Sequence, residues 1–192
     1  RVKAATPAIS RKIENILSYE KVFEFTLKEE MGELQWLEEA SYDVNYNANS
    51  ILSISLQIEG SGAYPSASTR YLVINTATGT RVRPADVFTN TGELLAKLVK
   101  IKDGLVAKAL VDIKNDPEMK EEDLAALFKD SDEYHKVTLD QFEVDEGGIT
   151  FYHEYGFPHV AKAMEPDGDF FLTWAELKPY IKTGGLLGQF VR

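Results

Sequence analysis

The sequence predicts an α+β protein in which an antiparallel sheet carries helices packed on one face. Two observations lead to this prediction. Segments with the two-residue alternation of strands follow one another as hairpins, joined by short turns of small residues. Segments with helical spacing come in groups, which disfavours a regular β-α-β alternation. We expect one domain over residues 1–192, with a helix and hairpin subregion at 1–60 and a helix-pair and hairpin subregion at 61–192.

Three stretches have the spacing of helices. Between residues 8 and 37 apolar side chains recur every three or four positions, but Glu20 and Gly32 interrupt the stripe. One long helix and two shorter helices both fit this pattern. Capping residues and apolar spacing predict a second helix over residues 90–113 and a third over residues 116–128.

The clearest strand covers residues 52–58. Leu52, Ile54, Leu56 and Ile58 alternate with Ser53, Ser55 and Gln57. One face of this strand is apolar and the other is polar, which is typical of an antiparallel sheet packed on one side only. We expect the apolar face to pack against the helix at 90–113, in one core with Phe151 and Tyr155. The loop that follows, Gly60 to Ser68, consists of small residues and one aromatic, Tyr64.

A second hairpin is predicted within residues 142–163. Ile149 and Phe151 alternate with polar neighbours, and the small residues at 145–148 suit a tight turn. An aromatic corner and a short helix-prone segment follow. A short strand at 170–173, a helix at 174–181 and a flexible tail from Gly184 complete the chain.

Composition limits the classes of function. The formal net charge is −10, which disfavours nucleic acid and anionic membrane surfaces as partners and permits a cationic partner. The chain has no cysteine, so disulfides, thiolate metal sites and a cysteine nucleophile are excluded. No apolar run reaches the ~20 residues of a membrane span, and we expect no direct membrane insertion by this fragment. The first residue is not Met and no signal peptide is visible, so a trimmed or mature fragment is expected.

Two segments come close to metal-binding motifs. Residues 165–176 have acidic side chains at the first, third, fifth and twelfth places of a calcium loop, but Phe170 stands where that loop needs glycine. An acidic turn before a strand is the favoured interpretation. His153-Glu154 and His159 fail the spacing of a zinc-binding helix, because Gly156 and Pro158 prevent a shared helical face. His153, on the apolar side of a strand, is interpreted as a core residue.

No pattern brings a nucleophile, a base or paired carboxylates together, so we predict no catalytic, cofactor-binding or metal-binding residues. Two residues remain as candidates for binding. Tyr64, alone among small loop residues, is either a surface anchor or an aromatic that covers the end of the sheet. His159, after Pro158, is a candidate for an exposed binding side chain.

Four stretches carry a family resemblance in their order and spacing. They are residues 5–17, 42–58 (YDVNYNANSILSISLQI), 75–88 (NTATGTRVRPADVF) and 142–163 (FEVDEGGITFYHEYGFPHVAKA). Together they resemble a bacterial envelope domain family of poorly known function. That family occurs as the extracellular part of a lysozyme-responsive anti-sigma factor and beside peptidoglycan deacetylase domains. Where the family often has Gly-Gly-Ala-His, this chain has Gly62-Ala63-Tyr64-Pro65, so a role of that histidine does not transfer to Tyr64.

The resemblance implies a non-catalytic binding or sensing module that is extracytoplasmic, whether secreted, periplasmic or a membrane-anchored ectodomain. Its implied partner is lysozyme, another cationic protein or a peptidoglycan-related cell-wall ligand. Two alternatives stay open: a calcium-binding module through residues 165–176, and an accessory domain of a peptidoglycan-modifying enzyme.

Overall fold

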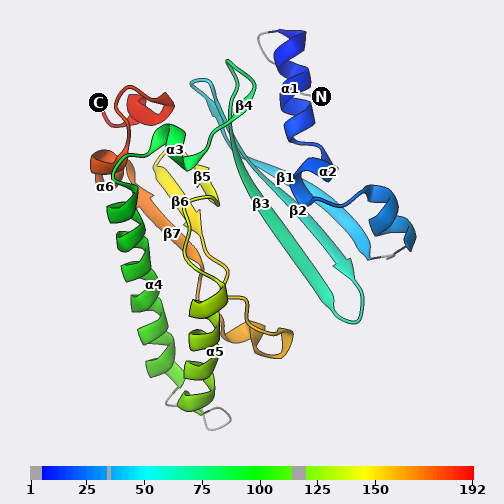
Figure 1. Cartoon of the computed structure of the whole chain (residues 1–192), viewed down its shortest axis with the longest axis vertical. Helices are drawn as coiled ribbons and strands as arrows, with labels where there is room; N and C mark the ends of the chain where they lie inside the picture. Colours follow the sequence, from blue (N-terminus) through cyan, green and yellow to red (C-terminus); the bar gives the residue numbers. More distant parts are fainter. Residues whose placement is uncertain (1–5, 34–35, 114–119) are drawn as a thin grey trace.

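The computed structural model describes residues 6–33, 36–113 and 120–192, which fold into two antiparallel sheets with helices (Figure 1). The first sheet has the order β1 (Leu37–Ala48), β2 (Ile51–Ser61), β3 (Pro65–Asn75), β4 (Thr80–Arg81). The second has the order β5 (Phe142–Val144), β6 (Gly148–Tyr152), β7 (Asp169–Thr173). The predicted α+β class with antiparallel pairing is therefore confirmed.

Along the sequence, helices precede the first sheet, connect the first sheet to the second, and follow the second sheet. The α-helices are α1 (Pro7–Ile16), α2 (Tyr19–Phe23), α3 (Pro84–Val87), α4 (Thr91–Ile113), α5 (Glu121–Tyr134) and α6 (Trp174–Leu177). Shorter turns are the π-helix η1 (Glu29–Glu33) and the 3-10 helices η2 (His159–Met164), η3 (Lys178–Tyr180) and η4 (Leu186–Phe190). The stripe at 8–37 thus forms short helices, and the predicted start of the third helix at 116 lies outside the described residues.

Strand β2 is covered on both faces. Leu52 and Ile54 pack with Ile13 of α1, while Ile51 packs toward the second sheet. The prediction that the apolar face of this strand meets α4 is therefore wrong, because α1 occupies that face. The prediction of a polar, solvated face is also wrong. Ser53 is fully buried, and its hydroxyl accepts a hydrogen bond from the Val144 backbone N–H at 2.9 Å, so burial leaves it satisfied.

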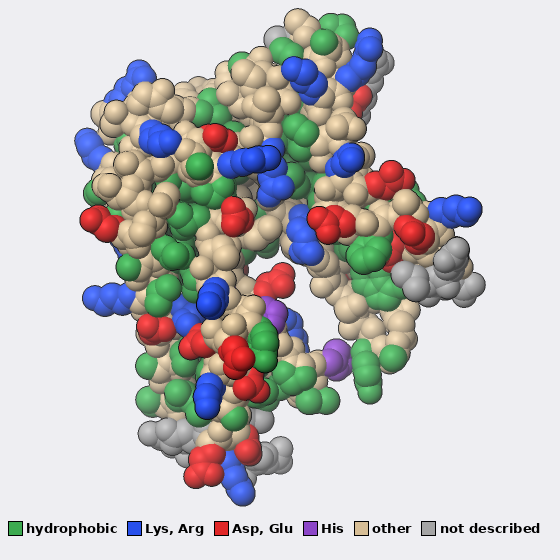
Figure 2. Space-filling model, in the orientation of Figure 1, with side chains coloured by type: hydrophobic (Ala, Val, Ile, Leu, Met, Phe, Trp, Pro, Cys, Tyr) green, Lys and Arg blue, Asp and Glu red, His purple; other side chains and the backbone are tan. Residues whose placement is uncertain are grey.

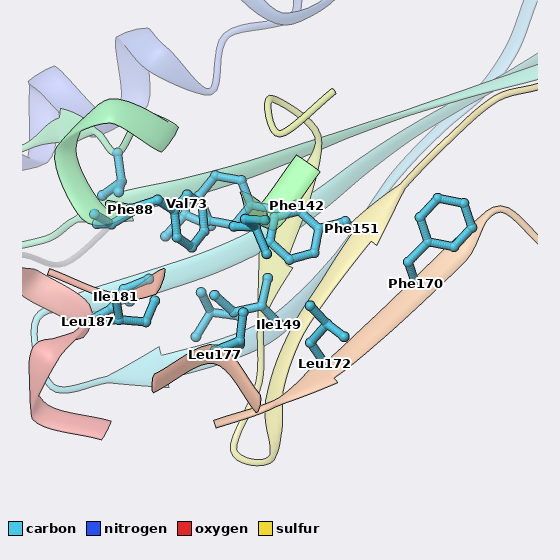
Figure 3. Close-up of a cluster of buried hydrophobic side chains, with 14 of the residues drawn as sticks. Val73, Phe88, Phe142, Ile149, Phe151, Phe170, Leu172, Leu177, Ile181 and Leu187 are labelled. Atoms are coloured by element: carbon cyan, nitrogen blue, oxygen red, sulfur yellow. The ribbon is translucent and has the colours of Figure 1, made fainter. Parts of the chain in front are cut away.

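The largest core lies between the first sheet, the second sheet and α4. Val73 of β3 and Phe142 of β5 join Phe151 of β6 in this core, together with Leu94 and Leu98 of α4. Figure 3 shows side chains from both sheets and from the C-terminal segment pointing into one cluster. Tyr155 belongs to a separate cluster with Leu124 and Phe128 of α5, which corrects the expectation of a single shared core.

The C-terminal end of the chain departs from the sequence prediction. The tail after Gly184, predicted to be flexible, forms η4 and buries Leu187 and Val191 in the main core. Its Phe190 ring stacks on Trp174 with centroids 4.2 Å apart.

Within the described ranges, no helix is both long and apolar enough to cross a membrane.

The buried face of β2 gives a test of the fold. Replacing Ile54 with Ala removes a side chain that is 5% exposed against α1 and should lower the free energy of unfolding by ~2–5 kcal/mol. Val44, which pairs with Ile54 in the sheet but is 49% exposed, provides the control. Val44→Ala should change stability by less than ~0.5 kcal/mol. Equal effects in urea denaturation would contradict the register described above.

Candidate functional site

A cleft of about 470 Å³ opens between the first sheet and the C-terminal end of α5. Figure 2 shows a hollow between the part of the molecule that carries the first sheet and the part that carries α4 and α5. Its walls come from β3, the end of α5 and the end of β6. They are Thr69, Arg70, Tyr71, Glu133, Tyr134, His135, Lys136, Thr138, Gln141, Tyr152, His153 and Glu154.

Two tyrosines from different sheets stack in this cleft. The rings of Tyr71 on β3 and Tyr152 on β6 lie with centroids 3.5 Å apart and planes at 3°. Gln141 links the same two strands, because its side-chain oxygen accepts from the Tyr71 N–H at 3.3 Å and its backbone oxygen accepts from the Tyr152 N–H at 3.0 Å. Glu143 on β5 accepts from the Tyr152 hydroxyl and from Asn45 of β1, the latter at 2.6 Å.

Burial sets the protonation of this cluster. It raises the pKa of Tyr71 to about 12, with the nearby carboxylates of Asp169 and Glu143 adding to the effect. Burial, and then the hydrogen bond to Glu143, also raise the pKa of Tyr152. Burial raises the pKa of Glu143 as well. Both phenols are therefore neutral at physiological pH and offer ring faces and hydrogen bonds, and neither is suited to act as a base or nucleophile.

His153 is a core residue, as interpreted from the sequence. It is 7% exposed, its ring meets Tyr155 edge-on at 4.7 Å, and its backbone N–H donates to the Gly168 carbonyl at 2.9 Å. Burial lowers the pKa of His153 to about 4, and the positive charge of Lys102 adds to this effect. His153 is therefore neutral at pH 7. Its Nε2 atom makes no hydrogen bond with any described residue.

The two residues predicted to take part in binding, Tyr64 and His159, touch each other. Their rings stack with centroids 4.8 Å apart and planes at 26°. Tyr64 lies at the tip of the β2–β3 hairpin and is 64% exposed, while His159 opens the turn η2 and is also exposed. The predicted Gly60–Ser68 loop is thus mostly strand, and only residues 62–64 form its tip. The stack joins the tip of the β2–β3 hairpin to η2, two segments that are far apart in the sequence.

The segment with the calcium-loop pattern has another structure. Residues 169–173 form β7, and Thr173 and Glu176 form a capping box that begins α6. Glu176 also forms an ion pair with Lys97 at 3.2 Å. Glu165 accepts from the Phe157 N–H at 2.7 Å and pairs with Lys162. In the described part of the chain, no three His, Asp or Glu side chains gather closely enough to hold a metal ion.

Sequence reasoning missed the cluster of Tyr71, Gln141, Glu143 and Tyr152. Tyr71 and Tyr152 each stand beside apolar residues, and the sequence could assign each tyrosine only to one of the two faces of its own strand. Their meeting depends on the packing of one sheet against the other, which no local pattern encodes.

Comparisons with known proteins show the fold. No protein-family model and no curated protein matches the sequence. A solved structure of a DUF3298 family member from Bacteroides fragilis NCTC 9343 superposes with a TM-score of 0.53 and 16% identity, covering 95% of this chain and 67% of that one. A DUF3298 family protein from Pseudomonas aeruginosa PAO1 gives a TM-score of 0.47 and 11% identity, covering 74% of this chain. This chain spans 61% of the Pseudomonas protein's length. At 16% identity, the likeness to the Bacteroides protein shows the fold alone.

The low pKa of His153 predicts acid sensitivity. The folded state favours neutral His153 and the unfolded state does not, so its contribution to stability is complete above the ordinary value of 6.5 and is lost as pH falls toward about 4. His153→Phe keeps the ring contacts but cannot titrate. Urea denaturation between pH 7 and 4 should show the parent losing more stability than the variant, by at most ~1.4 kcal/mol per pH unit. Parallel pH profiles for the two proteins would contradict this account.

Proposed function

We propose that the protein is a non-catalytic binding module of the bacterial cell envelope, and that its ligand contacts the Tyr64–His159 pair and the cleft beside it. The observation that carries the proposal is the stack of these two exposed rings. A stacked, surface-exposed aromatic pair is partly pre-ordered, so a partner that covers it gains apolar contact at a reduced cost in side-chain entropy. In this role the protein works outside the cytoplasm, secreted, periplasmic or anchored.

The charge of the chain favours a cationic protein as the partner, with lysozyme the first to test. Acidic residues number 31 against 21 basic ones. A net negative surface raises the association rate with a positively charged protein. A low dissociation rate also requires an anchor, a side chain that becomes buried in the interface. Tyr64 has the size, exposure and position of such an anchor. The neutral tyrosines of the cleft supply ring faces and hydrogen bonds rather than catalytic groups, which supports binding over catalysis.

The test is the binding of lysozyme to the immobilised protein at low and at physiological salt. The association rate should fall as salt rises, because the Debye length shrinks from ~30 Å at 0.01 M to ~8 Å at 0.15 M, and binding should persist at the higher salt. Tyr64→Ala should raise the dissociation rate about tenfold or more. Tyr42, a tyrosine of β1 that is 67% exposed, supplies the control. Tyr42→Ala should leave both rates unchanged.

Binding seen only at low salt would mean nonspecific charge attraction, and no binding at either salt would remove lysozyme as a partner. Equal effects of Tyr64→Ala and Tyr42→Ala would remove the stacked pair from the binding surface. Soluble peptidoglycan fragments, tested in the same assay, cover the second implied class of ligand.

A further inference from the structure

A second pocket lies on the other face of the β2–β3 hairpin. Along β3, Val73 packs toward the second sheet and Leu72 toward α1, while Arg70 borders both the cleft and the side that faces the N-terminal helices. A pocket of about 280 Å³ opens on that helix-facing side, beyond the end of the apolar cluster around Ile13. Its principal walls are Phe23, Phe25, Glu30, Trp36, Ile58 and Arg70.

Hydrogen bonds and close packing hold Trp36 in one position in the wall of this pocket. Its backbone N–H donates to the Glu30 carbonyl at 3.0 Å, and its own carbonyl accepts from the Ser61 N–H at 3.0 Å. The ring N–H donates to the Ser66 hydroxyl at 3.1 Å. The indole lies directly over Gly60, where any Cβ atom would overlap Trp36. Three independent hydrogen bonds and a glycine therefore hold one aromatic wall in place.

One wall of the pocket is an acidic side chain that forms no ion pair with any described residue. Glu30 is 4% exposed, yet its carboxylate makes no hydrogen bond and no ion pair with any residue that the structure describes. The phenol of Tyr19 lies near enough for the charge of Glu30 to raise the pKa of Tyr19, after the larger effect of burial.

A guanidinium group of opposite charge lines the same pocket. Arg70 is half-buried and donates to the Ser68 hydroxyl at 2.9 Å and to the Thr69 carbonyl at 3.0 Å. Over the described ranges it has no carboxylate partner, and Glu30 and Arg70 do not form an ion pair with each other. Glu30 and Arg70, which carry opposite charges, thus line the same small pocket. The aromatic side chains of Phe23, Phe25 and Trp36 line the rest of it.

We propose that this pocket binds a zwitterionic α-amino acid with an apolar side chain. The ammonium group meets Glu30, the carboxylate meets Arg70, and the side chain packs against Phe23, Phe25 and Trp36. A ligand with only a positive charge would be repelled by Arg70, and one with only a negative charge would be repelled by Glu30. The pocket volume suits a single amino acid, and Phe25, 52% exposed, would be covered by it. The pocket and the cleft share Arg70 as a wall residue, and the inference does not rest on the proposed function.

Isothermal titration with leucine and phenylalanine tests the inference on the unmodified protein. Each amino acid is compared with its N-acetyl derivative, which lacks the ammonium group, and with its amide, which lacks the carboxylate. We expect saturable binding of at least one zwitterion at one site per chain, and at least tenfold weaker binding of both derivatives. Absence of saturable binding, or equal binding of a zwitterion and its amide, would overturn the proposal.

Variants then assign the two charges. Glu30→Gln should weaken binding of the zwitterion about tenfold while leaving the weak affinity for the N-acetyl derivative unchanged or improved, and Arg70→Met should do the same with respect to the amide. Glu59, exposed on β2, supplies the control, because Glu59→Gln should leave every affinity unchanged. Unaltered zwitterion binding in Glu30→Gln would overturn the assignment. If that variant does not fold, the affinities of the unmodified protein for the amino acid, its N-acetyl derivative and its amide still test whether both charges of the ligand are recognised.

Discussion

The crossing of residues 141–144 over the inner face of the first sheet holds the molecule together. This short segment exchanges one side-chain hydrogen bond with each of three strands: Asn45 of β1 donates to Glu143, Ser53 of β2 accepts from Val144, and Tyr71 of β3 donates to Gln141. The main hydrophobic core surrounds the same crossing. Because these polar groups are paired and wholly or partly buried, a shift of one residue in β5 would break several of these hydrogen bonds, at a cost of up to about 1–3 kcal/mol for each group left buried and unsatisfied.

The cleft and its aromatic residues follow from that crossing. With β5 fixed on the first sheet, β6 brings Tyr152 against Tyr71, and the chain after β6 turns away toward α5 and η2. The long β2–β3 hairpin extends past the second sheet, so that its tip reaches η2 and Tyr64 meets His159. The hairpin therefore lines both the cleft and the pocket of Glu30, and Arg70 borders the two.

Local sequence patterns were sufficient for the class of fold and for most strands and turns. The alternation at 52–58 identified a strand, but alternation cannot say what covers each face, and burial of Ser53 depends on a hydrogen bond to a residue far along the chain. The apolar stripe at 8–37 did not show that Leu37 begins a strand, since sheet pairing overrides helical spacing there. Tyr64 and His159 were separate candidates because nothing local links them. Nothing in the sequence indicated that Glu30 is buried, because its neighbours Trp36 and Arg70 in the pocket come from other segments of the chain.

The contact of the hairpin tip with η2 through the Tyr64–His159 stack is the central claim, and a distance measured across this contact is the most direct test. The chain has no cysteine, so spin labels can be placed uniquely by Ala63→Cys at the tip and Val160→Cys on η2, where Val160 is 89% exposed. Pulsed electron paramagnetic resonance should give one narrow distance distribution, and adding Tyr64→Ala should broaden it and move it to longer distances. A broad distribution that is the same with and without Tyr64 would contradict the account.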